Sequence, residues 1–229
     1  IAAVGFLIDR QGLRAFGFDS ADAEQIDAEH LERVRTRQSE ELGVAACLLI
    51  VGLFDIGNSS DAFLVLRAQE RGLSVAGILA MLITFNLIYT LISTPAGALS
   101  DKIGRRRIIV AGWLIYALIY LGFALASTGV HIWLLYAVYG LYYGLAYGTS
   151  KAMVADLVPE ALRGTAYGTY NGIIGILDLP ASLIAGILWQ GLGSWQGFGA
   201  AAPFYFGAGT ALLAALFMAI WQKSLGKTI

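Results

Sequence analysis

Six apolar stretches, each close to twenty residues long, occupy most of the chain after residue 41. The hydrocarbon core of a bilayer is about 30 Å thick, and a helix of about 20 apolar residues spans it. The 229 residues are 58% hydrophobic and 14% charged, whereas soluble domains are about 45–50% apolar and about 25% charged. The chain is therefore predicted to be an integral membrane protein. The expected spans are Leu42–Leu66, Leu73–Leu99, Ile108–Ala126, Ile132–Met153, Thr165–Gln190 and Pro203–Trp221.

Helices rather than strands are expected within these stretches. Only α-helices and closed β-barrels satisfy every backbone hydrogen-bonding group in lipid, and barrel strands alternate in polarity over about ten residues. The run MLITFNLIYTLIS at residues 81–93 does not alternate. The predicted fold class is all-α, with six transmembrane helices. The first span is the least regular, because it is interrupted by Asp55, Asn58, Ser59, Ser60 and Asp61.

The basic residues predict which side of the membrane each connection faces, because cytoplasmic connections carry an excess of Lys and Arg. One set of connections, with Lys151 at its edge, holds 13 of the 15 Lys and Arg residues; the other set holds only Arg67 and Arg71. The basic set is expected to be cytoplasmic, which places both ends of the six-helix block inside the cell. This set consists of residues 9–41, 100–107, 154–164 and the C-terminal tail.

Residues before and after the six spans are assigned to separate parts. Residues 1–8 are apolar but too few to cross a bilayer, so we interpret them as the stump of a preceding transmembrane helix. Residues 9–41 hold nine of the 16 acidic residues and are expected to form a cytoplasmic linker, with a regulatory partner site as the alternative. Residues 42–222 would form the bundle, and residues 223–229 a cytoplasmic tail.

The most specific motif is GALSDKIGRRR, residues 97–107, between the second and third spans. It predicts a tight turn between antiparallel helices: Gly97 is small where helices cross, and Gly104 permits a turn conformation closed to other residues. Asp101 can accept hydrogen bonds from a helix N-terminus or pair with an arginine. A basic cluster alone would indicate only a cytoplasmic anchor, but the spacing G-x-x-x-D-K-x-G-R-R is more specific.

This spacing resembles the signature loop of the major facilitator superfamily of secondary transporters, which lies between helices two and three and again between helices eight and nine. VPEALRGTAYGTYNGIIG, residues 158–175, looks like the loop and helix start after helix ten of that family, with Arg163 among the matching residues. GLFDIGNSSDAFLVLRAQERGLS, residues 52–74, looks like helix seven of some bacterial members. The matching loop residues are Gly97, Asp101, Lys102, Gly104, Arg105 and Arg106.

The resemblance implies the C-terminal half of a twelve-helix transporter, helices seven to twelve, because residues 9–41 match the central cytoplasmic loop of the family. It implies transport of a small molecule by alternating access, with proton-coupled efflux as the expected form, in a bacterial plasma membrane. The expected partners are the substrate, the lipid bilayer and the N-terminal half of the same transporter. No nucleic acid and no cofactor are expected.

Polar residues within the spans are the candidate substrate or proton sites. An ionisable side chain at the bilayer centre costs about 2.5–3.5 kcal/mol or more and usually faces the bundle interior. Asp178 lies near the middle of the fifth span, and Pro180 is expected to break the helix beside it. Asp55 lies at a similar depth in the first span, whereas a structural hydrogen bond is favoured for Asp61. The other candidates are Asn58, Asn86, Asn171 and Tyr143.

Glycines recur every fourth residue in the fourth span and at the start of the fifth, which predicts grooves where consecutive helices approach closely. A tyrosine precedes each glycine of the fourth span and is either an aromatic cavity wall or bundle packing. The five tryptophans are interpreted as anchors at the membrane interface. The residues concerned are Gly140, Gly144, Gly148, Gly164, Gly168, Gly172, Tyr139, Tyr143, Tyr147, Trp113, Trp133, Trp189, Trp195 and Trp221.

Two other functions are alternatives to transport. A non-transporting receptor or scaffold could retain the fold, and loss of the loop motif would favour it, but the motif is intact. A membrane-embedded enzyme would need a cluster such as H-E-x-x-H, or paired acids with a histidine at the membrane face. The sequence contains no such cluster, so no enzyme is predicted. With two histidines and the single Cys47, no metal site is predicted either.

Overall fold

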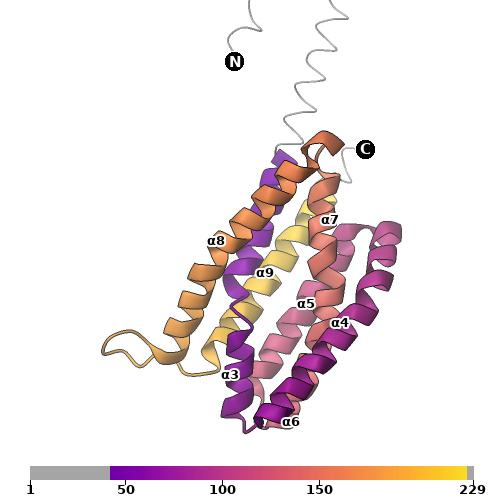
Figure 1. Ribbon diagram of the computed structural model, residues 1–229. Helices are drawn as coiled ribbons and strands as arrows, with labels where there is room; N and C mark the ends of the chain where they lie inside the picture. The colour runs from indigo at the N-terminus through magenta and orange to yellow at the C-terminus, as the bar shows by residue number, and fades with distance from the viewer. Residues whose placement is uncertain (1–41, 226–229) are drawn as a thin grey trace, which may run out of the picture. The chain divides into compact units, whose positions relative to one another are not determined.

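The computed structural model describes residues 42–225, with side chains described to residue 221. Within this range the regular structure is helical, apart from an isolated bridge between Leu192 and Trp195 in a loop (Figure 1). The all-α prediction is therefore confirmed for this part of the chain. The predicted helix stump, residues 1–8, and linker, residues 9–41, lie outside the described residues.

The helices follow one another with short connections. A helix over residues 42–57 comes first, and a π-helical turn, η1, interrupts the later run from α6 to α7. The elements are α3 (Ala62–Glu70), α4 (Val75–Ile103), α5 (Arg105–Leu125), α6 (Gly129–Tyr142), η1 (Tyr143–Tyr147), α7 (Gly148–Asp156), the 3-10 turn η2 (Glu160–Leu162), α8 (Arg163–Gln190) and α9 (Ala202–Leu225).

Five helical segments of the described chain are long and apolar enough to cross a membrane. The remaining predicted span, Ile132–Met153, falls on the run from α6 through η1 to α7, so the count of six stays a prediction. Large apolar side chains cover the outside of the bundle, which is the surface that lipid would contact. The five segments are Leu42–Glu70, Val75–Ile103, Arg105–Leu125, Glu160–Gln190 and Ala202–Trp221.

Local sequence explains where several helices begin and end. The Ser74 hydroxyl accepts a hydrogen bond from the backbone N–H of Gly77 at 3.2 Å and caps α4, and Thr128 caps α6 in the same way. Gly104 ends α4 and starts α5 with φ of 96°, a conformation that L side chains rarely adopt. The predicted role of Gly104 in the turn is confirmed.

The first span breaks at residues 58–61, between the helix over residues 42–57 and α3. The polar side chains there compete with helical hydrogen bonds: the Ser60 hydroxyl accepts from the backbone N–H of Ala62 at 3.3 Å. The Ser182 hydroxyl on α8 accepts from the backbone N–H of Ser60 at the same distance.

The expected break beside Pro180 is wrong, because α8 continues from Arg163 to Gln190. A proline removes one backbone donor, and the other hydrogen bonds of this long helix keep it continuous.

Helix α5 lies at the centre of the packing. It contacts α9 along much of its length and also packs against α6 and η1. Helix α4 packs mainly on α6 and η1, and α8 packs on α7 and α9. Accordingly, α4 and α8 lie at opposite edges of the bundle (Figure 1). Most residues in the apolar part of each of these two helices are not buried, in contrast to those of α5.

The glycine predictions are confirmed only in part. A Cβ on Gly140 would lie 2.8 Å from the Phe85 carbonyl oxygen, and one on Gly144 would lie 2.6 Å from Ile92. The helix that approaches them is α4, and not the next helix along the chain as expected. The other predicted close approaches are wrong within the described residues, because a Cβ there meets nothing within 4 Å. These open positions are Gly97, Gly148, Gly164, Gly168 and Gly172.

Arg67 is buried where α3 meets the end of α5. Its Nε donates to the Phe123 carbonyl at 3.1 Å, and its Nη2 donates to the Ala124 carbonyl at 3.0 Å. Glu70 pairs with the same guanidinium at 2.6 Å. The last carbonyls of a helix have no partner within it, so Arg67 satisfies two of them on α5 and holds α3 in place.

Candidate functional site

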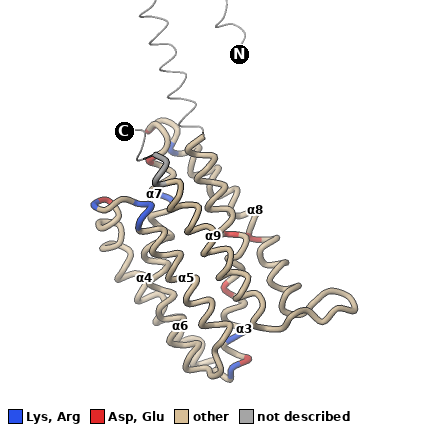
Figure 2. The backbone as a smooth tube through the Cα atoms, turned by 180° about the vertical axis from the view of Figure 1, so that it is seen from behind, with Lys and Arg blue, Asp and Glu red and all other residues tan. Residues whose placement is uncertain are grey.

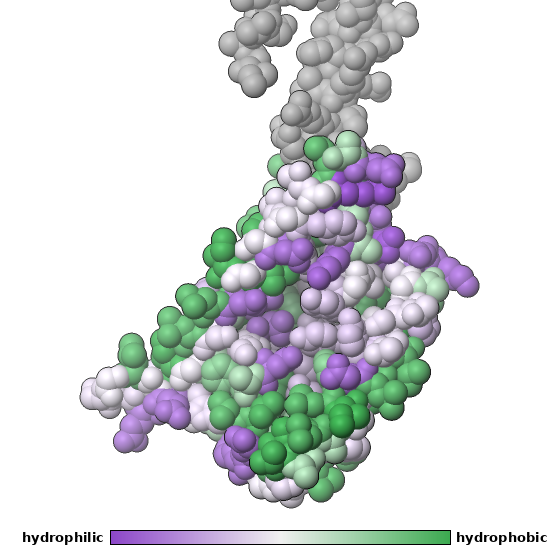
Figure 3. All heavy atoms as spheres, viewed as in Figure 1, coloured by the Kyte–Doolittle hydropathy of each residue, from purple (hydrophilic) through white to green (hydrophobic). Residues whose placement is uncertain are grey.

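Two adjoining cavities lie between the broken first span, η1 and α8. Their volumes are about 260 Å³ and 620 Å³, and Asn58, Tyr143 and Asp178 line both. The smaller cavity also reaches Asp55, and the larger one reaches Asp61 and the serines at the break. Figure 3 shows a hollow in this face of the bundle, with hydrophilic residues around it and apolar residues on both flanks. Four of the candidate residues from the sequence therefore meet: Asp55, Asn58, Tyr143 and Asp178.

Asp55 and Asp178 approach the smaller cavity from different helices. The Asp55 side chain is 4% exposed, whereas Asp178 is exposed on α8, and the two carboxylates interact electrostatically. Oδ2 of Asp55 and Oδ1 of Asn58 are buried and have no hydrogen-bond partner among the described residues. In Figure 2 acidic residues lie partway along the bundle, away from the charged clusters at its ends. The site thus has two carboxyl groups and unsatisfied acceptors.

Asp61 is held by a hydrogen bond across the bundle. The Tyr139 hydroxyl donates to its Oδ1 at 3.0 Å, and the carboxylate does not cap α3, although Asp61 occupies the N-cap position. This contact agrees with the structural hydrogen bond favoured for Asp61. The residue nevertheless lines the larger cavity, so a third carboxyl group borders the two cavities.

Aromatic rings form one wall of the smaller cavity. Phe54 and Trp113 stack with centroids 4.8 Å apart, and Tyr143 and Tyr147 stack at 5.5 Å. Trp113 is 1% exposed, so its interpretation as an interface anchor is wrong. Position in a span cannot separate a tryptophan at the interface from one turned inward. Trp113, Tyr170, Phe54 and Ser182 are lining residues that were not predicted.

Asn86 and Asn171 are not brought to these cavities. Both side chains are exposed and line neither cavity. The Asn86 amide donates to the carbonyl of Leu82, one turn earlier in α4, at 2.8 Å. Neither asparagine joins the cluster around Asp55 and Asp178 within the described residues.

The signature loop forms a charged cluster at the end of the bundle where α4 meets α5. Arg105 pairs with Asp101 at 3.0 Å, which is one of the two interactions expected for Asp101. Arg105 also donates to Asp156, a residue that sequence spacing did not indicate. Arg106 lies 3.8 Å from the ring centroid of Trp221, so it joins α5 to α9.

Two further members of the predicted loop set lie apart from this ion pair. Arg163 lies 3.9 Å from Glu160 at the start of α8. Lys102 is exposed at the end of α4. Both contribute basic charge at the bundle ends, where Figure 2 places the lysines and arginines of the bundle.

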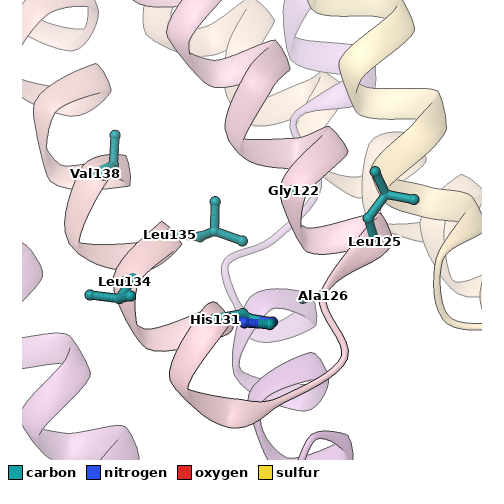
Figure 4. A pocket seen from close by; sticks show the side chains of 7 residues that line it. All are labelled: Gly122, Leu125, Ala126, His131, Leu134, Leu135 and Val138. Atoms are coloured by element: carbon teal, nitrogen blue, oxygen red, sulfur yellow. The ribbon is translucent and has the colours of Figure 1, made fainter.

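A third cavity, of about 410 Å³, lies between α5 and α6 and is almost wholly apolar. Figure 4 shows His131 at the start of α6 beside leucine side chains. The third cavity lacks the carboxylates and unsatisfied acceptors of the first two cavities, so it is a weaker candidate for a functional site. No group of three or more His, Cys, Asp or Glu that could hold a metal ion is found in the described part of the chain. The residues of the third cavity are Gly122, Leu125, Ala126, His131, Leu134, Leu135 and Val138.

A helical bundle with an apolar exterior and several membrane-length helices defines an integral membrane protein. The chain belongs to the Major Facilitator Superfamily, whose sequence profile matches residues 44–226. This confirms the resemblance of the loop motif.

Several curated proteins are similar to this chain. An uncharacterized MFS-type transporter of Methanocaldococcus jannaschii is 39% identical over 149 residues, which cover 62% of this chain and 37% of the relative. A probable transporter of Saccharomyces cerevisiae is 28% identical, covering 65% of this chain and 26% of the relative. A Na⁺, Li⁺, K⁺/H⁺ antiporter of Planococcus maritimus is 26% identical, covering 53% and 30%. The matched region is thus well under half the length of each relative.

Proposed function

We propose that this chain is the C-terminal six-helix half of a secondary transporter, which moves a small molecule by alternating access in proton-coupled efflux. The observation that carries the proposal is the meeting of Asp55, Asn58, Tyr143 and Asp178 around two adjoining cavities. Family membership and relatives with the word transporter in their names support it.

In this proposal the residues of the hollow have separate roles. Asp178 and Asp55 bind the proton, while Asn58 and Tyr143 contact the substrate. The N-terminal half completes the cavity, and Asn86 and Asn171 contribute to the part that this half closes. The membrane would be a bacterial plasma membrane, with the signature loop in the cytoplasm.

The loop cluster is proposed to close the cytoplasmic side in one state of the cycle. Asp101, Arg105 and Asp156 join the α4–α5 turn to the end of α7. Charge-assisted contacts of this kind can hold one of two arrangements of a bundle. Gly97, Lys102, Gly104, Arg106 and Arg163 complete the loop set in this role.

Alternating access can be tested without knowing the substrate. Ser182 lines the larger cavity and is half-buried, so Ser182→Cys in a Cys47→Ala background reports whether the cavity is open. In the full-length transporter, an impermeant thiol reagent should label this cysteine from either side of the membrane. Labelling from one side only, under every gradient applied, would contradict alternating access and favour the non-transporting scaffold.

Proton coupling has its own measurement. Asn resembles the protonated form of Asp, so Asp178→Asn should fix one protonation state. The thiolate fraction of any cysteine depends on pH, so the labelling rate of Ser182→Cys is divided at each pH by that of a cysteine at the exposed position Ser194. This ratio should change with pH in the parent and lose that dependence in Asp178→Asn. Glu160→Gln, at an exposed carboxylate near the start of α8, is the charge-matched control. An unchanged pH dependence in Asp178→Asn would assign the residue a structural role and move the proton to Asp55.

A further inference from the structure

The smaller cavity contains acceptors that the described part of the chain leaves unsatisfied. Asp55 is only 4% exposed, and its Oδ2 accepts no hydrogen bond from the described residues. Oδ1 of Asn58 is also buried and accepts no hydrogen bond from the described residues. Buried acceptors without partners are destabilising, so both oxygens are suited to a ligand that brings positive charge or donors.

Acidic side chains line both cavities. Asp55 and Asp178 face the smaller cavity, and Asp61 and Asp178 face the larger one. No Lys or Arg among the described residues lines either cavity. Lys151 lies beside them, with its ammonium 3.2 Å from the Tyr147 hydroxyl. A cation entering the hollow therefore meets carboxylates that no basic residue of the described bundle neutralises.

The uncharged part of the wall is aromatic. Rings of Trp113, Tyr142, Tyr143, Tyr147 and Tyr170 line the smaller cavity. The face of an aromatic ring attracts cations, and weakly hydrated organic cations benefit most from this. The ring of Tyr147 already attracts a cation of the protein itself, because the Lys151 ammonium lies 4.4 Å from its centroid.

We propose that the adjoining cavities bind an organic cation, a substituted ammonium or phosphonium ion, with its charge near Asp55 and Asp178. Its apolar groups would lie against Trp113, Tyr143 and Tyr147. Ca²⁺ and Mg²⁺ fit less well, because they take six or more oxygen ligands and rings occupy much of this wall. The proposal rests on the proposed function and names its substrate class. A proton on either carboxylate would compete with the organic cation, which is the exchange that coupled efflux needs.

Binding can be measured on the purified full-length transporter with no gradient across it. The probe is radiolabelled tetraphenylphosphonium in equilibrium dialysis, and the matched control ligand is tetraphenylborate, which has the same shape and opposite charge. The cation should bind saturably and the anion should not. The bound cation should decrease as the pH is lowered, because protonation removes the negative charge of a carboxylate, whereas the aromatic wall and Asn58 are uncharged throughout. Equal binding of the two ions, or a bound cation that does not change with pH, would overturn the proposal.

Single substitutions then assign the site. Asp55→Asn and Asp178→Asn should each weaken cation binding by about tenfold or more, and the control Glu160→Gln should not. Tyr143→Phe keeps the ring and should bind within about twofold, whereas Tyr143→Leu should lose several-fold. Elution volume and thermal stability identify any variant that has not folded, and the pH dependence of the unmodified protein does not depend on variants. Cation binding unaffected by both aspartate substitutions, or displaced equally well by sodium chloride and by tetraethylammonium chloride, would exclude this site.

The two proposals fail in different ways. Saturable cation binding combined with labelling of Ser182→Cys from one side only would refute transport and leave the cation site standing. Labelling from both sides without cation binding would leave transport standing and refute the cation as substrate.

Discussion

The guanidinium of Arg105 donates a hydrogen bond to the carboxylate of Asp156, 51 residues later in the chain. The same guanidinium pairs with Asp101, so one arginine joins the end of α4 and the end of α7. Both carboxylates are more than half exposed. Exposed pairs contribute about 0.2–1 kcal/mol each, which is enough to bias a conformational equilibrium but not to determine the fold.

We expect Asp101→Asn and Asp156→Asn each to leave the protein inserted in the membrane while opening its cytoplasmic side. The labelling rate of Ser182→Cys from the cytoplasm should increase by up to about fivefold, which corresponds to about 1 kcal/mol. The double variant should show less than the product of the two effects, because both carboxylates act through Arg105. Labelling rates that match the parent in all three variants would remove the gating role.

Arg67→Met should destabilise the bundle, because the carbonyls of Phe123 and Ala124 lose their donors. The expected loss is about 1–3 kcal/mol, measured as a lower unfolding temperature of the full-length protein in detergent. Arg67→Lys should not restore the loss, because an ammonium lacks the planar fork that reaches both carbonyls. Arg71→Gln is the control, since the Arg71 side chain has only a 3.9 Å ion pair with Glu70 within the part of the chain that the structure describes. An unfolding temperature for Arg67→Met equal to that of Arg71→Gln would contradict this role.

The orientation of the bundle is tested by Lys102→Cys and Ser194→Cys in a Cys47→Ala background. Both positions are exposed, and neither has the positive φ that makes Gly104 unsuitable for a cysteine. The excess of basic residues predicts that an impermeant reagent added outside the cell labels position 194 and spares position 102. The reverse pattern would invert the topology.

Gly140→Ala should lower stability, because the new Cβ would lie 2.8 Å from the backbone oxygen of Phe85. Overpacking of this kind costs about 1–3 kcal/mol, and α4 would have to move away from α6. Gly148→Ala, later in the same helical run, places its Cβ in open space and should cost little. The unfolding temperatures of the two variants test this prediction. Equal temperatures would mean that α4 and α6 can move apart without loss of stability.

Lys151→Gln should tighten the binding of tetraphenylphosphonium, because it removes a cation that occupies the ring of Tyr147. An increase of about two- to fivefold is expected for a site partly open to water. Lys151→Arg keeps the charge and should bind like the parent. Unchanged affinity in Lys151→Gln would mean that Lys151 does not share its ring with the ligand.

The helices and the loop turn could be predicted because their causes are local in sequence. Long apolar runs specify membrane-length helices, and Gly104 with the spacing of Asp101 and Arg105 specifies the turn and its ion pair. The cavities depend on which faces of distant helices meet, and a single sequence does not contain that information. Asp156 and Trp113 were missed for this reason.

The position of the helix break shows how two local signals compete. Pro180 was expected to interrupt α8, but one missing backbone donor did not end a helix of 28 residues. At residues 58–61 several side chains offer alternative partners to consecutive backbone groups, and the helix ends there. A cluster of short polar residues was the stronger signal, and the sequence already marked it as the irregular part of the first span.

The two helices on either side of the break at residues 58–61 are held by different contacts. On one side, Phe54 stacks on Trp113, and Gly57 fits closely against Gly207 of α9. On the other, Arg67 and Asp61 fasten α3 to α5 and α6. Four residues, 58–61, of this 29-residue membrane segment lie outside its two helices. Because both helices of the span attach to α5, through Trp113 on one side of the break and Phe123 on the other, a displacement of α5 moves Asp55 and α3 together.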